Sequence, residues 1–199
     1  HTRLQGDWSS DVCSSDLLRN VSASQLYAIP PSDLEDPYWI VEPVSCVVTG
    51  IDQCQLRVGE RLAMIGCGFM GLMMLQGLSG MGCEQIVALD VDADRLQLAK
   101  QMGADEIYDV TETNFDEVQA ALKARDIDVV VDTSGSQQGL DLAADIARRG
   151  GRINLFGWIK GERAYFNPSV WHTKGLTIVN SRSEEHTSEL QSPCNLVCR

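Results

Sequence analysis

Residues 62–90, LAMIGCGFMGLMMLQGLSGMGCEQIVALD, decide the fold. They begin with a short apolar run at 62–65, which has the length of a strand buried on both faces. The glycine motif GCGFMG at 66–71 follows and leads into a segment with helical character. A second apolar run at 86–89 ends in Asp90, which lies 19 residues after Gly71. This order of strand, glycines, helix, strand and acid predicts a dinucleotide-binding turn.

Each glycine of this G-x-G-x-x-G motif has a physical role in the prediction. Gly66 permits a tight turn out of the strand, and Gly68 lets the backbone approach a pyrophosphate. Gly71 lets the helix pack close to the sheet, and the helix N-terminus directs its free N–H groups at the phosphates. Asp90, at the tip of the second strand, can accept hydrogen bonds from the adenosine ribose hydroxyls.

Composition limits the classes of partner. The chain has 199 residues, of which 44% are hydrophobic and 22% are charged, so we expect a globular domain with a sizeable core. A formal net charge of −12 argues against a nucleic-acid surface, which needs clustered Lys and Arg. The longest uncharged apolar stretch, 62–78, contains glycines and is explained by a strand and a helix rather than a membrane span. We therefore expect no nucleic-acid or membrane partner.

The two ends of the chain have an unusual relation to each other. A reverse translation of RSEEHTSELQ at 182–191 gives a DNA whose opposite strand encodes DWSSDVCSSDL at 7–17. Such a pair resembles the two strands of a sequencing adapter. We therefore expect residues 1–17 and 182–199 to be foreign, disordered segments, and the chain to be a fragment.

The cysteines between these ends form no recognisable pattern. Cys46, Cys54, Cys67 and Cys83 include no C-x-x-C pair and have no histidine near them in the sequence. Isolated reduced cysteines are typical of a cytoplasmic protein, which is the location that we expect.

From residue 42 onward, apolar runs of strand length alternate with helical segments. Pro43 suits the first turn of a helix, and Asp92 is a plausible N-cap of the helix that follows the second strand. Later segments predict a helix at 139–149, with Arg148 and Arg149 at its C-terminal end, then a strand at 152–157 and a looser stretch before a strand at 176–181. Such alternation predicts an α/β fold, a doubly wound parallel sheet of six strands of the Rossmann dinucleotide-binding type.

On these motifs the sequence resembles the zinc-type medium-chain dehydrogenases, in the branch that holds polyol, threonine and secondary-alcohol dehydrogenases. The resemblance rests on Glu42-Pro43, on VGE before GCGFMG, on Asp90 with the DRL at 94–96, and on the GAD at 103–105. It continues through VDTSG at 131–135, GGR at 150–152 and KGLTIV at 174–179. The resemblance implies that residues 42–181 form an incomplete NAD-binding domain. It implies that residues 18–41 are the remnant of an upstream catalytic domain and its linker.

The resemblance also implies roles for individual residues. The cofactor NAD would lie on Gly66, Gly68, Phe69, Met70 and Gly71, with its ribose at Asp90. Arg95 would lie over the adenine, with a solvated helix charge as the alternative interpretation. The nicotinamide half would be lined by Thr133, Ser134, Gly135, Phe156 and Gly157. Glu42 matches a glutamate beside the catalytic zinc in some members, or it caps its own helix; the sequence leaves both interpretations open.

The family's main zinc ligands, a Cys, His and Glu set in an N-terminal domain, do not occur in this sequence. By resemblance, the full-length protein would transfer hydride from a small alcohol or polyol to NAD as a homo-oligomer, while this chain alone would be inactive. The alternative is a stand-alone dinucleotide-binding or sensing module. A short-chain dehydrogenase is disfavoured because Tyr-x3-Lys is absent, and a methyltransferase remains open. A carboxylate at Asp90 favours NAD over NADP, whose 2′-phosphate would lie beside it.

Overall fold

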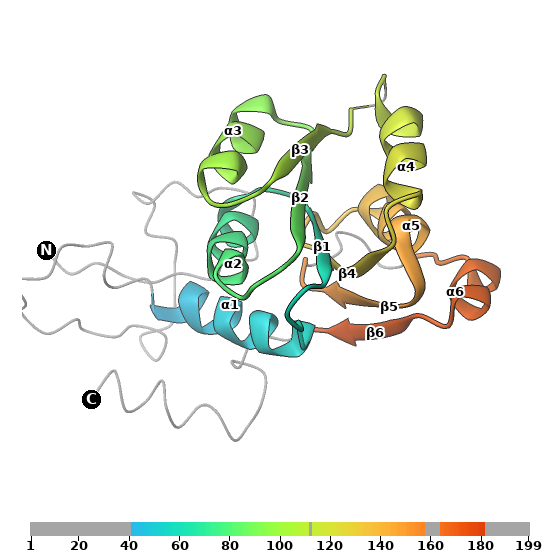
Figure 1. Cartoon of the computed structure of the whole chain (residues 1–199), viewed down its shortest axis with the longest axis horizontal. Helices are drawn as coiled ribbons and strands as arrows, with labels where there is room; N and C mark the ends of the chain where they lie inside the picture. Colours follow the sequence, from blue (N-terminus) through green and yellow to red (C-terminus); the bar gives the residue numbers. More distant parts are fainter. Residues whose placement is uncertain (1–40, 112, 158–163, 182–199) are drawn as a thin grey trace, which may run out of the picture. The chain divides into compact units, whose positions relative to one another are not determined.

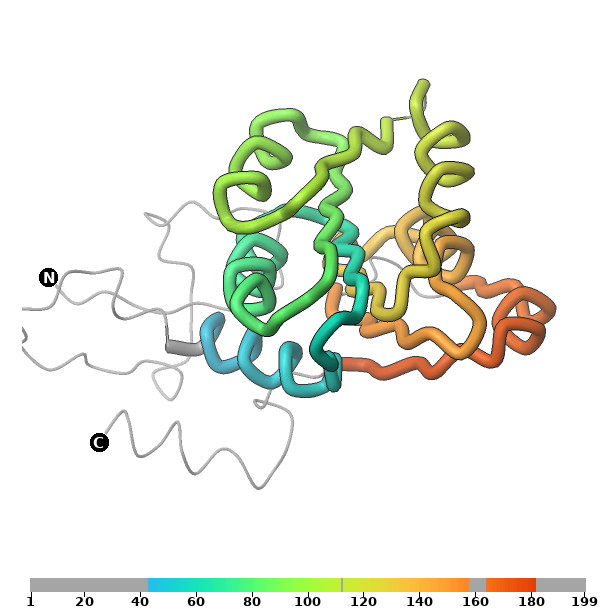
Figure 2. The backbone as a smooth tube through the Cα atoms, in the orientation of Figure 1, coloured from blue at the N-terminus to red at the C-terminus, as the bar shows by residue number. Residues whose placement is uncertain are grey.

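A computed structural model describes residues 41–111, 113–157 and 164–181, with only the backbone of residues 41 and 42 (Figures 1 and 2). The predictions for residues 1–40 and 182–199 lie outside this part. Its helices are α1 Val41–Cys54, α2 Phe69–Ser79, α3 Ala93–Gln101, α4 Phe115–Lys123, α5 Gln137–Ile146 and α6 Pro168–Lys174. Its strands are β1 Arg61–Ile65, β2 Gln85–Asp90, β3 Glu106–Asp109, β4 Ile127–Asp132, β5 Ala147–Leu155 and β6 Thr177–Asn180.

The strands form one parallel sheet in the order β3-β2-β1-β4-β5-β6, which is the doubly wound order. The predicted fold class and six strands are therefore confirmed. Strand β1 lies in the middle, where Ile65 pairs with Leu89 of β2 and with Asp132 of β4. Consequently the ends of β1, β2 and β4 meet at one edge of the sheet, and the loops that follow these strands lie next to one another.

Helices cover both faces of the sheet, which explains the uninterrupted apolar runs in its strands. On one face, α1, α2 and α3 pack against alternate strand residues such as Leu62 and Met64. On the other, α4 and α5 pack against the intervening residues, such as Ala63 and Ile65, with part of α6 at the margin. Figures 1 and 2 show the two helical layers on opposite sides of the sheet. The core thus consists of two apolar layers that share the central strands.

Local signals place several helix ends as predicted. The Asp92 side chain accepts hydrogen bonds from the N–H groups of Asp94 and Arg95 at the start of α3, which confirms the predicted N-cap. Helix α3 ends before Gly103, whose φ of 110° is a conformation that glycine tolerates best. Helix α6, which we did not predict, begins with Pro168 after Asn167, whose side chain accepts from Ser169 N–H and Val170 N–H.

Two predicted boundaries differ from the structure. Helix α5 ends at Ile146, so Arg148 and Arg149 belong to β5, which starts at Ala147 and has an irregular register against β4. Arg148 Nε donates to Asp128 Oδ1 on β4 at 2.6 Å, a contact that holds the arginine at the sheet. The predicted looser stretch also contains α6, which carries Trp171 and His172. The first error arises from a contact between residues far apart in the chain. The second is a missed local signal, because Asn167, Pro168 and Gly175 mark the two ends of α6.

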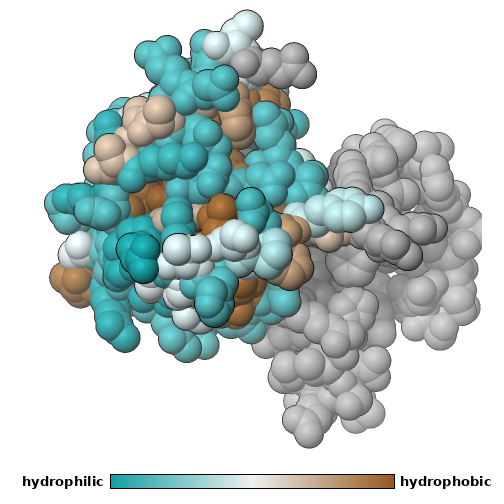
Figure 3. Space-filling view, turned by 90° about the vertical axis from the view of Figure 1, so that its right-hand side faces the viewer, coloured by the Kyte–Doolittle hydropathy of each residue, from teal (hydrophilic) through white to brown (hydrophobic). Residues whose placement is uncertain are grey.

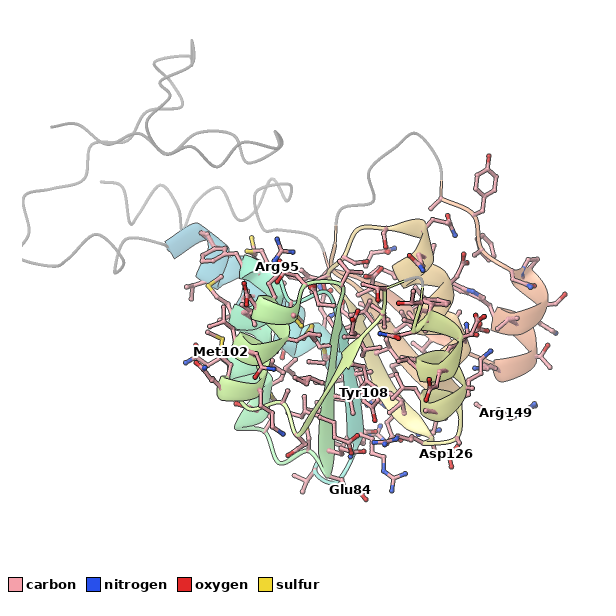
Figure 4. All side chains as sticks on the ribbon, turned by 90° about the horizontal axis from the view of Figure 1, so that it is seen from above. Glu84, Arg95, Met102, Tyr108, Asp126 and Arg149 are labelled. Carbon is pink, nitrogen blue, oxygen red and sulfur yellow. The ribbon has the colours of Figure 1, made fainter. Side chains whose placement is uncertain are left out.

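The carboxyl edge of the sheet is opposite the edge where Glu84 and Asp126 lie, as Figure 4 shows by the position of Arg95. Glu84 and Asp126 immediately precede β2 and β4, whereas Arg95 follows β2. Figure 3 shows that the side of the molecule with α4 and α6 is mainly hydrophilic, with apolar patches near its middle. Among the described residues, no helix has the length and apolar character needed to span a membrane.

Candidate dinucleotide-binding site

The chain leaves β1 through a tight turn at Gly66. Its φ is 91°, a value that L side chains rarely adopt, and its N–H donates to Leu89 O at 2.8 Å. A Cβ built on Gly66 would lie 2.9 Å from Ser134 N, inside contact distance. At Gly71, a Cβ would lie 2.2 Å from Gly66 O and 2.7 Å from Thr133 Oγ1. Both positions therefore require glycine so that α2 and the β4 loop can approach the turn.

Gly68 has the opposite surroundings. A Cβ built there would have no heavy atom within 4 Å, so the turn is open to solvent at this point. Gly68 is the N-cap of α2, and no side chain in the described part of the chain caps this helix start. The N-terminal N–H groups of a helix carry a partial positive charge and lack intrahelical partners. The open backbone and the uncapped helix start together suit an anion such as a phosphate.

The Asp90 side chain lies beside this turn at the end of β2. It is only 6% exposed, and its two oxygens accept separate backbone hydrogen bonds. Oδ2 accepts from Cys67 N–H at 2.5 Å, and Oδ1 accepts from Asp92 N–H at 2.9 Å. Ionised carboxylate oxygens offer about four acceptor positions in all, so Asp90 retains capacity for a ligand's hydroxyl groups.

Cys67 itself is fully buried within the turn. Burial, with the nearby charge of Asp90, raises the pKa of the Cys67 thiol to about 12. The thiol therefore stays protonated at neutral pH and is a poor nucleophile or metal ligand. The cysteines of the described segments are all free, in agreement with isolated reduced thiols.

The loop after β4 closes the site from the other side. Thr133 Oγ1 donates to the Gly66 and Ile65 carbonyls, at 2.7 and 3.2 Å. Ser134 and Gly135 continue the loop, and Gly135 has a φ of 61°. The Thr133 hydroxyl and the Ser134 N–H lie against the glycine turn, each 2.9 Å from a Cβ built on Gly66.

Asp132 is a site residue that we did not predict from the sequence. It is 1% exposed, and its Oδ1 accepts from Ser134 N–H and Ser134 Oγ–H at 2.9 and 2.6 Å. Burial raises the pKa of the Asp132 carboxyl, while the hydrogen bonds from Ser134 oppose this change. Its carbonyl accepts from Phe156 N–H and Gly157 N–H, at 2.9 and 2.7 Å. Asp132 therefore joins the loops after β4 and β5.

The two residues after β5 are placed differently from each other. Gly157 lies against the β4 loop, since a Cβ built on it would be 2.6 Å from Gly135 N. The Phe156 ring instead points toward helices α1 and α2, where it would meet a Cβ on Gly50 at 2.7 Å. The backbone of this segment thus adjoins the site, whereas the Phe156 ring belongs to the core.

A cavity of about 350 Å³ opens at this edge of the sheet. It is lined by the predicted residues Gly66, Gly68, Asp90, Arg95, Thr133 and Ser134. Sequence reasoning did not identify the rest of the lining, which comes from the ends of strands and from helices α4 and α5: Ile65, Val91, Val110, Phe115, Ser136, Gln138, Gly139 and Leu142. Its mixed apolar and polar character suits a small organic ligand.

Of the other predicted residues, Arg95 is half-exposed at the cavity, and its Nε lies 3.7 Å from Asp92 Oδ2. Phe69 is 53% exposed at the start of α2, whereas Met70 is half-buried against the core. For Glu42 the structure describes only the backbone, within α1, so its predicted place beside a metal stays a prediction. In the described ranges, no three His, Cys, Asp or Glu side chains form a group suited to a metal ion.

A family model described as "Zinc-binding dehydrogenase" matches residues 70–192, which is more than half of the chain. The chain belongs to the zinc-binding dehydrogenase family. The predicted resemblance is therefore confirmed at family level, and the match covers α2 through β6 of the described fold.

Two curated family members illustrate the relation. Sorbitol dehydrogenase of Bacillus subtilis is 29% identical over 133 residues, covering 66% of this chain and 38% of that protein. L-Threonine 3-dehydrogenase of Bacillus licheniformis is 30% identical over 151 residues, covering 73% of this chain and 42% of that protein. The chain thus spans less than half the length of these curated relatives.

Solved structures support the same fold. Galactitol-1-phosphate dehydrogenase from Escherichia coli superposes with a TM-score of 0.67 at 22% identity, over 89% of this chain and 53% of that one. A putative zinc-binding dehydrogenase from Sinorhizobium meliloti, bound to NADP, gives a TM-score of 0.62 at 21% identity, over 79% of this chain and 46% of that one. At these identities the likeness establishes the fold of the dehydrogenase domain.

Proposed function

We propose that the cavity at the carboxyl edge of the sheet binds NAD, with the pyrophosphate on the Gly66–Cys67–Gly68 turn and the adenosine ribose at Asp90. The observation that carries this proposal is the contrast in space around the three glycines. Gly66 and Gly71 are closed by neighbouring atoms, while Gly68 is open on its Cβ side. A turn that only connects a strand to a helix does not need this open face beside an uncapped helix.

The remaining predicted residues extend the proposed site in two directions. Arg95 would lie over the adenine, and Phe69 and Met70 would contribute their N–H groups from the first turn of α2. Thr133, Ser134 and Gly135 would border the nicotinamide half together with the backbone of Phe156 and Gly157. When bound, NAD accepts a hydride; this chain's residues bind and orient it.

Cofactor choice follows from the charges near the ribose. The buried Asp90 carboxylate can accept hydrogen bonds from both ribose hydroxyls, whereas an NADP 2′-phosphate would bring a second negative group beside it. Arg95 lies near Asp92, so its charge is already shared with a carboxylate. An exposed ion pair returns only about 0–1 kcal/mol, too little to offset this repulsion. We therefore propose NAD rather than NADP.

We further propose that the full-length protein is a cytoplasmic, homo-oligomeric dehydrogenase that transfers hydride from a secondary alcohol or polyol to NAD. The support is family membership and relatives named for polyols and for threonine. Zinc would supply Lewis acidity to the substrate oxygen in that protein, with Glu42 near it. The described residues of this chain do not themselves offer a metal-binding group, so we propose that it cannot complete the reaction alone.

The proposal is tested by calorimetric titration of the whole chain with NADH, followed by incubation with NAD, zinc and a panel of polyols. We expect NADH binding that is lost in Gly68→Val, because the new side chain would occupy the open face. We expect no NADH formation from any alcohol. Failure of NADH to bind would contradict the cofactor site, and zinc-dependent NADH production well above background would contradict the inactivity of this chain. The alternative function, a stand-alone dinucleotide-binding module, predicts a different result for the full-length protein. That protein would bind NAD but would oxidise no alcohol.

A further inference from the structure

The Asp90 carboxylate is already engaged before any ligand is present. Its Oδ2 accepts from Cys67 N–H, and this 2.5 Å hydrogen bond spans 23 residues of sequence. Cys67 lies between Gly66 and Gly68, so the bond connects the end of β2 directly to the glycine turn. The side chain is almost fully buried, which removes the competition of water for this contact.

The glycine turn is held from its other side as well. Thr133 Oγ1 donates to Gly66 O at 2.7 Å, and Gly66 N–H donates to Leu89 O at 2.8 Å. The turn is therefore fixed by both strands that flank β1. Glycine backbones have the greatest conformational freedom of any residue, so a turn with two glycines needs such contacts to keep one geometry.

From this arrangement we infer that Asp90 is also a positioning residue: its carboxylate orients the Cys67–Gly68 backbone so that the turn is preorganised for a diphosphate. The inference rests on the proposed function and extends it. If the Asp90 carboxylate contacted the ribose alone, its removal would weaken the binding only of ligands with ribose hydroxyls. A carboxylate that also positions the turn affects every diphosphate ligand, with or without those hydroxyls.

Two probes separate these effects. ADP carries the diphosphate and the ribose hydroxyls, while 2′,3′-dideoxy-ADP carries the diphosphate alone. We would measure the Kd of each by calorimetry for the whole chain and for Asp90→Ala, Asp90→Asn and Asp94→Ala. Asp94→Ala is the matched control, because it removes the same charge four residues further along the chain, and Asp94 is exposed on α3 and makes none of the described contacts to the turn.

For Asp90→Ala we expect dideoxy-ADP binding to weaken about tenfold, and ADP binding to weaken further, since a hydrogen bond to a charged group contributes about this factor. Asp90→Asn keeps one acceptor oxygen and should bind dideoxy-ADP more tightly than Asp90→Ala does. Asp94→Ala should stay within about twofold of the unaltered chain, as an exposed charge contributes little.

An unchanged Kd for dideoxy-ADP in both Asp90 variants, with weaker ADP binding, would overturn the positioning role and leave the proposed function intact. If the unaltered chain binds neither probe, the proposed function fails instead. Thermal melts identify a temperature at which each variant is folded. Should Asp90→Ala not fold, Asp90→Leu replaces it, because leucine is of similar size and offers no acceptor to Cys67 N–H. Equal dideoxy-ADP binding in Asp90→Leu and Asp94→Ala would overturn the inference.

Discussion

The three glycines of the turn differ in the space that surrounds them, and this space defines what each can tolerate. Gly71 is packed against the Gly66 carbonyl, so an added methyl group would lie 2.2 Å from Gly66 O and force α2 away from the turn. Gly68 has ordinary backbone angles, with φ of −70°, and nothing lies within 4 Å of its Cβ position. The fold therefore requires glycine at position 71, and the proposed ligand requires glycine at position 68.

Substitutions at these two positions should consequently separate folding from binding. Gly71→Ala should lower the free energy of unfolding by about 1–3 kcal/mol, because it overpacks a closed contact. Gly68→Ala should change the free energy of unfolding by less than about 1 kcal/mol, since the loss of the glycine N-cap is offset by the lower conformational entropy of the unfolded chain. Urea denaturation measures both, and equal destabilisation by the two variants would contradict the assignment of separate roles.

Asp132 should make stability depend on pH. Burial raises the pKa of its carboxyl above the ordinary value of 3.8, so the folded state holds the proton to higher pH than the unfolded state. The contribution of the protonated Asp132 carboxyl to the free energy of unfolding is fully present below pH 3.8. It is lost as the pH rises through the folded-state pKa. Asp132→Asn keeps an acceptor for Ser134 without this titration.

The free energy of unfolding of the unaltered chain minus that of Asp132→Asn should therefore decrease as the pH rises above 3.8, the ordinary pKa of the carboxyl. Urea titrations at several pH values provide this difference, and the subtraction removes the effects of other groups. A difference that stays constant with pH, or increases, would show that the pKa of the Asp132 carboxyl is not raised in the folded state.

At the scale of elements, the C-terminus of α5 is stabilised by a side chain from α6. Lys174 Nζ donates to the carbonyls of Ala144, Asp145 and Ala147 at 2.8, 2.6 and 2.7 Å. These carbonyls lie at the negative end of the helix, where a cation is favourable. Burial lowers the pKa of Lys174, although Asp145 opposes this change. One lysine thus joins α5, the start of β5 and α6.

Lys174→Met should therefore lower the free energy of unfolding by about 1.5–3 kcal/mol, the range for hydrogen bonds to charged groups. Lys123→Met is the matched control, because Lys123 Nζ lies 3.2 Å from Asp145 Oδ2 in an exposed pair that should contribute below about 1 kcal/mol. The measurement is chemical denaturation of both variants. Comparable losses would show that the Lys174 contacts contribute no more than a surface ion pair.

Lys174 also shows where sequence reasoning reached its limit. The alternation of strands and helices, and local features such as the Asp92 cap, could be predicted because they depend on neighbouring residues. Arg148 and Arg149 matched the pattern of a basic helix end, yet the cation at that end comes from Lys174, 29 residues after Asp145. No local pattern contains that contact.

The residues of the candidate site likewise fall into those that could be predicted from the sequence and those that could not. Gly66, Gly68, Gly71 and Asp90 could be predicted because adjacent parallel strands fix the distance between a glycine turn and the next strand's end. Asp132 and the cavity residues Val110, Phe115 and Leu142 could not, since their positions depend on which loops and helices meet at the sheet edge. Whether Phe156 faced a ligand or the core likewise depended on α1, which supplies Gly50.

For the part of the chain that the structure describes, the doubly wound sheet and the family match agree with one domain of the zinc-binding dehydrogenase family. The chain spans less than half the length of its curated relatives. What this chain can be tested for directly is cofactor binding and cofactor choice. Both depend on the turn at Gly68 and on the carboxylate of Asp90.

The most direct test is a calorimetric titration of the whole chain with NADH and with NADPH under the same buffer and salt. We predict that NADH binds more tightly by about one to two orders of magnitude, because hydrogen bonds from the ribose to the Asp90 carboxylate contribute about 1.5–3 kcal/mol and a 2′-phosphate forfeits one of them. Equal or tighter binding of NADPH, or no binding of either cofactor, would contradict the account.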